Sequence, residues 1–149
     1  MQVVIATDGS EAALEAARSA LRLLAGEAEL ALVHVVPLEE DPMAMAGGFE
    51  GPLFTAAEVK QIHEQQVAHG EEIINKTEEA LGTPAAHLVV SAADVGEAIC
   101  QTAVERNADV IVMGESEKGW FRRLLEGSAM QHVVRHAPCP VIVVPHHPA

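Results

Sequence analysis

Aromatic side chains are scarce in this chain. Phe, Trp and Tyr together make up 3% of its 149 residues, and tyrosine is absent. Hydrophobic residues nevertheless account for 49% of the chain, so its core must be built from aliphatic side chains. Proteins that bind single-stranded nucleic acids commonly stack the bases on aromatic rings, and the composition argues against that class.

Positively charged side chains are also scarce in this chain. The chain has 9 Lys and Arg against 22 Asp and Glu, which gives a formal net charge of -13 at pH 7. This charge repels nucleic-acid phosphates and anionic membrane surfaces at long range, so neither is expected as a partner. The cations are also unevenly placed, because one C-terminal stretch holds Lys118, Arg122, Arg123 and Arg135.

Long apolar runs, leader patterns and metal-ligand patterns are missing from the sequence as well. No run approaches the roughly 18 to 20 apolar residues of a membrane-spanning helix. The N-terminal MQVVIATDGS lacks a basic leader, so a cytoplasmic location is expected. Cys100 and Cys139 form no CxxC pair, which favours two reduced, buried thiols. The histidines show no zinc-ligand spacing, and no metal site is predicted.

The sequence does contain short aliphatic runs that alternate with helical patterns. Strands are predicted at residues 2–7, 29–37, 87–92, 109–114 and 140–145. Helices are predicted at residues 10–26, 55–81, 96–107 and 128–136. This alternation predicts a single α/β domain over residues 1–149, with a parallel sheet flanked by helices. A glycine- and proline-rich stretch at about residues 38–54 predicts a long mobile loop.

Some helices carry finer predictions. Thr55 and Glu58 match a capping box at the start of the 55–81 helix. The weak apolar pattern of that helix predicts that it is more exposed than the first. In the 96–107 helix, Ile99, Ala103 and Val104 are expected to face inward. A second capping box is predicted at residues 128–131.

The segments after the first and fourth strands are the expected ligand-binding positions, because ligands in such folds bind beyond the carboxyl ends of the strands. A Walker loop is not matched there, since Trp120 follows Gly119 in place of the required lysine. Gly127 and Ser128 either offer helix-terminal amides to an anion or only turn and cap the last helix. Asp8 is either a turn residue or a carboxylate for a ribose, an adenine group or magnesium. At this point both alternatives stay open.

Together, the segments ATDGSE, LVHVVP and IVMGESEKGWFRRLLEGSAMQHVVRHAPCPVIVVP resemble the universal stress protein family over essentially the whole chain. The resemblance implies a single-domain three-layer sandwich, with a five-stranded parallel sheet of order 3-2-1-4-5 and helices on both faces. It also implies a homodimer made through the last strand, Pro140 to Pro145. In one branch of the family it implies bound ATP, or AMP or ADP, with or without Mg.

The ATP-binding branch carries the pattern G-x-x-G, nine residues, then G and a serine or threonine. Gly114 and the pair Gly127 and Ser128 match this pattern, but its second glycine falls on Glu117. A carboxylate about 4 Å from a phosphate costs roughly 1 kcal/mol in water and about 4 kcal/mol with surface-like screening. Flexibility at Gly119 and the neighbouring cations offset this cost.

The resemblance gives each site residue a role. Thr7 and Asp8 would lie near the sugar and base, Val35 would offer backbone hydrogen bonds to adenine, and Met113 would pack by the base. Ser128 and Ala129 would meet phosphates. The full set of expected nucleotide-binding residues is Ala6, Thr7, Asp8, Val35, Met113, Gly114, Glu117, Gly119, Gly127, Ser128 and Ala129.

The expected function is that of a nucleotide-responsive regulatory module of the stress response, with at most slow ATP hydrolysis. The alternative is a nucleotide-free universal stress protein that acts only through protein–protein contacts, with Glu117 disrupting the ATP loop. A third alternative, an enzyme of the wider adenine-nucleotide hydrolase-like superfamily, would need an SGGxDS-type first loop, which ATDGSE does not supply. No nucleophile motif such as G-x-S-x-G is present, so no catalytic residue is predicted.

Overall fold

The computed structural model describes residues 1–24, 26–38, 55–115 and 129–146. Its five strands form one parallel sheet in the order β3-β2-β1-β4-β5. The strands are β1 (Gln2–Ala6), β2 (Glu29–Pro37), β3 (Ala85–Ala92), β4 (Val110–Gly114) and β5 (Val141–Val144). The expected fold class and strand order are therefore confirmed.

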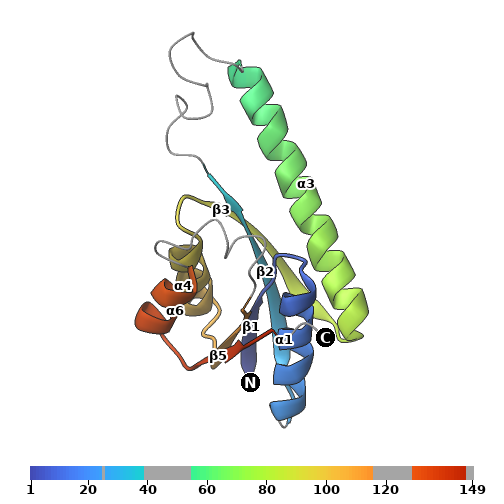
Figure 1. The fold of residues 1–149 in the computed structure, drawn as a ribbon, viewed down its shortest axis with the longest axis vertical. Helices are drawn as coiled ribbons and strands as arrows, with labels where there is room; N and C mark the ends of the chain where they lie inside the picture. Colours follow the sequence, from blue (N-terminus) through green and yellow to red (C-terminus); the bar gives the residue numbers. More distant parts are fainter. Residues whose placement is uncertain (25, 39–54, 116–128, 147–149) are drawn as a thin grey trace.

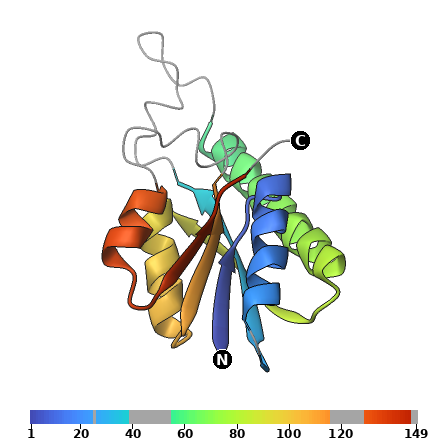
Figure 2. The same cartoon turned by 60° about the horizontal axis from the view of Figure 1, so that its bottom comes forward.

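Helices cover both faces of the sheet. Figures 1 and 2 show α1 and α3 on one face, with α4 and α6 on the other. Their bounds are α1 (Glu11–Leu23), α3 (Ala56–Leu81), α4 (Val95–Glu105) and α6 (Ala129–His136). Because all strand pairings are parallel, the carboxyl ends of the strands lie at one edge of the sheet, where such folds bind ligands.

The strand sequences build two aliphatic cores, one on each side of the sheet. Alternate residues of a strand point to opposite faces, so Val3 and Ile5 join the core beneath α1 and α3. Val4 and Ala6 join the core beneath α4 and α6. Both faces of the central strands are buried, which explains why their sequences are continuous apolar runs.

The helix starts follow the predicted caps. Ser10 caps α1, since its hydroxyl oxygen accepts a hydrogen bond from the Ala13 N–H at 3.1 Å. The capping box that opens α3 is confirmed, because Thr55 and Glu58 exchange side chain to backbone hydrogen bonds in both directions. The predicted box at residues 128–131 begins outside the described residues.

Some expectations need correction. Val104 was predicted to face inward, but its side chain lies on the outer side of α4 and is 54% exposed, while Ile99 and Ala103 are buried. The same helix ends at Glu105 rather than at Asn107, which adopts a left-handed backbone with φ 49°. Asn tolerates that conformation and terminates helices by it.

Other expectations concern the exposure of α3 and the cysteines. As expected, α3 is largely exposed and buries only Gly70, Ile74 and Thr77. Both thiols are free, with Cys100 buried and Cys139 half-buried beside the same core. Burial raises the pKa of each thiol, so both favour the unreactive protonated form.

Candidate functional site

The turn after β1 is built around Asp8. One carboxylate oxygen, Oδ1, accepts a hydrogen bond from the Ser10 N–H at 2.9 Å, and Gly9 supplies the positive φ of 80° that the turn requires. The other oxygen, Oδ2, is buried and has no hydrogen-bond partner in the described part of the chain. Asp8 therefore does form the turn, and it also presents an acceptor that the turn does not use.

Thr7 is held in the fold by hydrogen bonds of its backbone N–H and of its hydroxyl group. Its N–H donates to the Val33 carbonyl at 2.9 Å, and its hydroxyl oxygen accepts from the Gly9 N–H at 3.2 Å. The hydroxyl lies 3.4 Å from that of Thr77, whose own proton goes to the Ile73 carbonyl at 2.8 Å. Since each hydroxyl has one proton, Thr7 is the donor between the two threonines.

His34 completes this polar cluster, a position that was not predicted from the sequence. Its Nδ1 lies 2.9 Å from the Thr7 carbonyl oxygen, and because a carbonyl only accepts, Nδ1 must carry the proton. Burial lowers the pKa of His34, against the opposing effects of the Thr7 hydrogen bond and the Asp8 charge, while His69 lowers it further. The ring is therefore neutral at neutral pH.

A glycine within α3 makes room for this imidazole. A Cβ at Gly70 would lie 2.6 Å from His34 Cδ2 and 3.2 Å from Val89 Cγ1. Glycine inside a helix costs about 1 kcal/mol relative to alanine, and the contact with His34 explains its presence. The signal available in the sequence was a lone histidine in the apolar run ELALVHVVP and a glycine inside a long helix.

The glycines on the other side of the site serve close packing. A Cβ at Gly114, at the end of β4, would lie 2.6 Å from the Ala12 carbonyl oxygen in the first turn of α1. A Cβ at Gly96 in α4 would lie 2.8 Å from His132 Cβ and 2.9 Å from the Ala129 carbonyl oxygen. The absence of a side chain at Gly114 is thus required by helix α1, whether or not a phosphate binds nearby.

The structure describes seven of the expected site residues. Those that are buried, with exposed fractions of 3% or less, are Ala6, Thr7, Val35, Met113 and Ala129. Asp8 is half-buried and Gly114 is buried. The ends of β1, β2 and β4 bring most of these residues to one edge of the sheet, with Ala129 at the start of α6. Glu117, Gly119, Gly127 and Ser128 lie outside the described residues.

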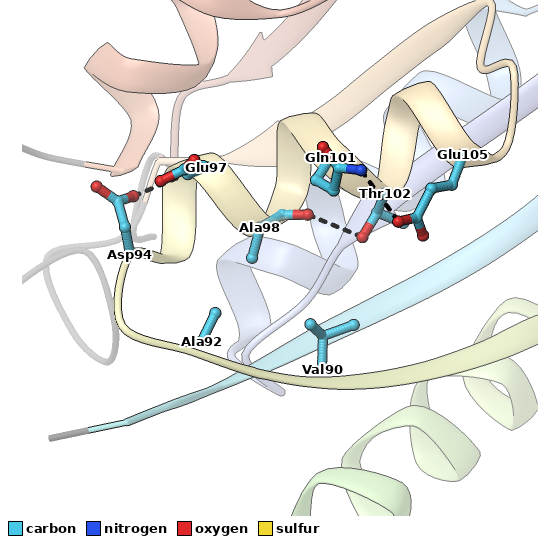
Figure 3. A pocket seen from close by; sticks show the side chains of 8 residues that line it. All are labelled: Val90, Ala92, Asp94, Glu97, Ala98, Gln101, Thr102 and Glu105. Carbon is cyan, nitrogen blue, oxygen red and sulfur yellow. Dashed lines mark hydrogen bonds between the residues drawn. The ribbon is translucent and has the colours of Figure 1, made fainter. Parts of the chain in front are cut away.

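Two surface hollows lie elsewhere. Figure 3 shows one of about 350 Å³ between β3 and α4, with Val90, Ala92 and Ala98 among its lining residues. It also carries the carboxylates of Asp94, Glu97 and Glu105, which disfavour an anionic phosphate. The second, of about 460 Å³, lies between α1 and the end of α3 and includes none of the expected site residues.

Within residues 1–24, 26–38, 55–115 and 129–146, no three His, Cys, Asp or Glu side chains gather in an arrangement suited to a metal ion. In the same ranges, no helix combines the length and apolar character needed to cross a membrane.

The geometry can now be compared with known proteins. The Universal stress protein family model matches residues 1–145. Universal stress proteins of Methanocaldococcus jannaschii and Thermus aquaticus are each 31% identical to the chain. The first match covers 96% of this chain and 81% of the relative, and the second covers 95% and 96%.

Solved structures share the architecture. The universal stress protein UspA from Lactobacillus plantarum superposes with a TM-score of 0.70 at 23% identity and 97% coverage of both chains. A universal stress protein in complex with cAMP gives 0.61 at 23% identity, covering 99% of this chain and 98% of its own. An Arabidopsis thaliana family protein with AMP bound gives 0.63 at 16% identity, covering 99% and 92%.

A parallel sheet of order 3-2-1-4-5 with helices on both faces places the protein among the doubly wound α/β domains. Because the family model covers nearly the whole chain, a narrower assignment follows. The chain belongs to the universal stress protein family.

Proposed function

We propose that this protein binds an adenine nucleotide at the carboxyl ends of β1, β2 and β4. The observation that carries the proposal is the buried Asp8 Oδ2, an acceptor without a partner among the described residues. Sugar hydroxyls and the adenine amino group are donors, so they suit such an atom. Related solved structures that contain AMP or cAMP support the same class of ligand.

In this proposal, residues of the chain contact the sugar, the base and the phosphates of the nucleotide. Asp8 accepts from the sugar or base, the backbone of Val35 pairs with adenine, and Met113 packs against the ring. The N-terminal amides of α6, beginning at Ala129, attract the phosphates together with Gly127 and Ser128. ATP with Mg is the proposed physiological form, with AMP and ADP as weaker ligands.

Binding in this place requires local movement, because Val35 and Met113 are fully buried. We infer that nucleotide entry displaces the atoms that cover them, and that partner proteins respond to this change. The same burial, together with the packing role of Gly114, favours a second candidate function. In that alternative the protein binds no nucleotide and acts only through protein contacts, with Glu117 blocking the phosphate loop.

The proposed assembly is a homodimer formed through the last strand. β5 lies at one edge of the sheet, and its four residues, Val141–Val144, are half-buried. An apolar edge strand with one free side is a template for pairing with a second copy. We place this dimer in the cytoplasm as a regulatory stress-response module, with any ATP hydrolysis slow.

Calorimetric titration with MgATP and AMP tests the nucleotide proposal, alongside mass spectrometry of small molecules released from freshly purified protein. Asp8→Asn should weaken AMP binding about tenfold, because a carboxylate hydrogen bond is replaced by a weaker amide one. Asp94→Asn is the matched control, since Asp94 also accepts a backbone N–H at 2.9 Å but caps α4. Absence of binding at millimolar ATP, with no released nucleotide, would favour the nucleotide-free alternative.

Glu117→Gly separates the two candidate functions. If the Glu117 carboxylate opposes phosphate, its removal should strengthen MgATP binding more than AMP binding, because ATP carries more phosphate charge. Glu115→Gly is the control for losing a neighbouring charge. Equal changes in both variants would show that net charge matters and that the position of Glu117 does not.

A further inference from the structure

The hydrogen-bond ladder between β1 and β2 ends before Val35, next to the candidate site. Its last paired residues are Ala6 and Val33, and the final rung is the Thr7 N–H donating to the Val33 carbonyl at 2.9 Å. In a parallel ladder, alternate residues of one strand bond to the same neighbour. The next rungs would therefore join Val35 to the Thr7 carbonyl and to the Gly9 N–H.

Both of those partner groups are held by side chains instead. The Thr7 carbonyl accepts from His34 Nδ1 at 2.9 Å, and the Gly9 N–H donates to the Thr7 hydroxyl oxygen at 3.2 Å. The N–H and C=O of Val35 thus face the carboxyl end of β1 beyond the last rung. Among the described residues, neither group has a partner on β1, and because a buried backbone pair outside a ladder is costly, a ligand that pairs with both groups recovers that cost.

The position of the imidazole is fixed from two sides. On one side its Nδ1–H is bonded to the Thr7 carbonyl, and on the other its ring packs where Gly70 leaves no side chain. The residue as a whole is buried, with an exposed fraction of 7%. The imidazole N–H therefore takes the place at the Thr7 carbonyl that the next rung of the ladder would give to the Val35 N–H.

We propose that His34 is a positioning residue for adenine recognition, because its hold on the Thr7 carbonyl keeps the N–H and C=O of Val35 available to the base. This inference rests on the proposed nucleotide site. Adenine offers an acceptor at N1 beside a donor at its amino group, which matches one N–H and one C=O. Hypoxanthine, the base of IMP, has the opposite pattern, because its N1 is a donor and an acceptor oxygen replaces the amino group. His34 therefore also supports selection of AMP over IMP.

The test compares AMP and IMP affinities for the intact protein and three variants by calorimetry. The wild type should prefer AMP over IMP by about tenfold or more, because the wrong base leaves buried polar groups unpaired. His34→Leu removes the donor and frees the Thr7 carbonyl to pair with Val35, so AMP affinity and the preference should each fall about tenfold. His34→Asn keeps a short donor and should restore most of the preference.

His87→Leu is the control, because His87 lies on β3 and contacts Glu78 rather than Thr7. It should leave both affinities unchanged. Should His34→Leu fail to fold, Gly70→Ala provides the second variant. Its Cβ would press on the imidazole from α3, and the preference for AMP should fall while the histidine remains.

A nucleotide-independent measurement accompanies the titrations. Nitrogen NMR of the imidazole should show the Nδ1–H tautomer of His34 at neutral pH. The opposite tautomer would overturn the inference even if AMP binds. If the wild type binds AMP but His34→Leu keeps the same ratio of AMP to IMP affinity, the inference alone fails. If the wild type binds no adenine nucleotide, that result contradicts the proposed function and therefore also this role for His34.

Discussion

Two neighbouring regions at the carboxyl edge of the sheet are built on different principles. At the β1–β2 end, defined by Thr7, Asp8 and His34, polar side chains bond to backbone atoms, and one carboxylate oxygen of Asp8 has no hydrogen-bond partner among the described residues. At the β4–α6 end, defined by Gly96, Gly114 and the start of α6, backbones approach each other where no side chain fits. The first region is specified by hydrogen bonds and the second by steric exclusion.

The difference shows that a motif residue can have a structural purpose independent of its ligand. Gly114 matches the nucleotide pattern, yet its contact with Ala12 already demands glycine. Asp8 also has a structural bond through Oδ1, but its Oδ2 has no partner in the part of the chain that the structure describes. Mutations at the β4–α6 end should therefore act on stability at every pH, whereas mutations at the β1–β2 end should change ligand binding or pH dependence.

The largest expected effect comes from Gly114→Ala. Its Cβ would meet the Ala12 backbone at 2.6 Å, and main-chain atoms cannot yield as a flexible side chain does, so unfolding should become easier by about 3 kcal/mol. Urea unfolding at pH 7 measures the loss. Gly26→Ala is the control, because nothing lies within 4 Å of its Cβ and only its φ of +112° is strained. A loss at Gly114 no larger than at Gly26 would contradict the packing role.

Gly96→Ala should produce the next largest loss. The added Cβ would press on His132 and on the Ala129 carbonyl, forcing α4 and α6 apart. Overpacking costs typically about 1–3 kcal/mol, and the gain in helix propensity returns about 1 kcal/mol, so a net loss of up to about 2 kcal/mol is expected. The loss should be the same at pH 5 and pH 7. A stabilised variant would mean that helix propensity outweighs the contact between the helices.

His34 should give the β1–β2 end a pH dependence that the glycine variants lack. Its folded pKa lies below 6.5 because burial of the ring, helped by the nearby His69, outweighs the raising effects of the Thr7 hydrogen bond and the Asp8 charge. The unfolded chain then binds the proton more readily, so stability is intact above about pH 6.5 and falls as the pH drops toward the folded pKa. The slope of that loss is at most about 1.4 kcal/mol per pH unit.

Urea unfolding from pH 8 to pH 5 measures this effect as the difference between wild type and His34→Asn, which cannot bind the proton. The difference should be constant above pH 6.5 and shrink below it. Gly114→Ala serves as the control, since its pH profile should run parallel to that of the wild type. Parallel profiles for His34→Asn as well would contradict a depressed pKa.

The smallest effect is expected from Thr77→Val. The change removes a hydroxyl that bonds to Thr7 at 3.4 Å and to the Ile73 carbonyl at 2.8 Å. The Ile73 bond lies within a helix, and the Thr7 contact is long, so the loss should stay below about 1 kcal/mol. Thermal unfolding detects it. A loss of several kcal/mol would show that Thr77 anchors the β1–β2 end more firmly than its distances indicate.

Much of the fold could be predicted from local patterns. Apolar runs marked the strands within two residues, and capping signals marked the start of α1 and α3. Val104 was misplaced because a valine one position beyond the buried Ala103 still fits an apolar pattern, although the helix turns it to solvent. Periodicity identifies the helix, but small shifts in its rotation decide which marginal residue is buried.

The residues of the candidate site also differ in whether the sequence alone could identify them. Asp8 could be found because a turn signal follows an apolar strand. His34 and Gly70 could not, since they are 36 residues apart in the sequence and acquire meaning only when α3 packs against β2. Glu117, which the family pattern singles out, remains a prediction because it lies outside the described residues.

By itself, the sequence determined the elements, their alternation and the family, because hydrophobic period and capping chemistry act between residues close along the chain. Only the tertiary structure decided that His34 bonds to the Thr7 carbonyl, that Gly70 makes room for its ring, and that Gly114 packs against α1. The physical reason is that close contact and burial depend on which distant segments meet, and a single sequence does not state that.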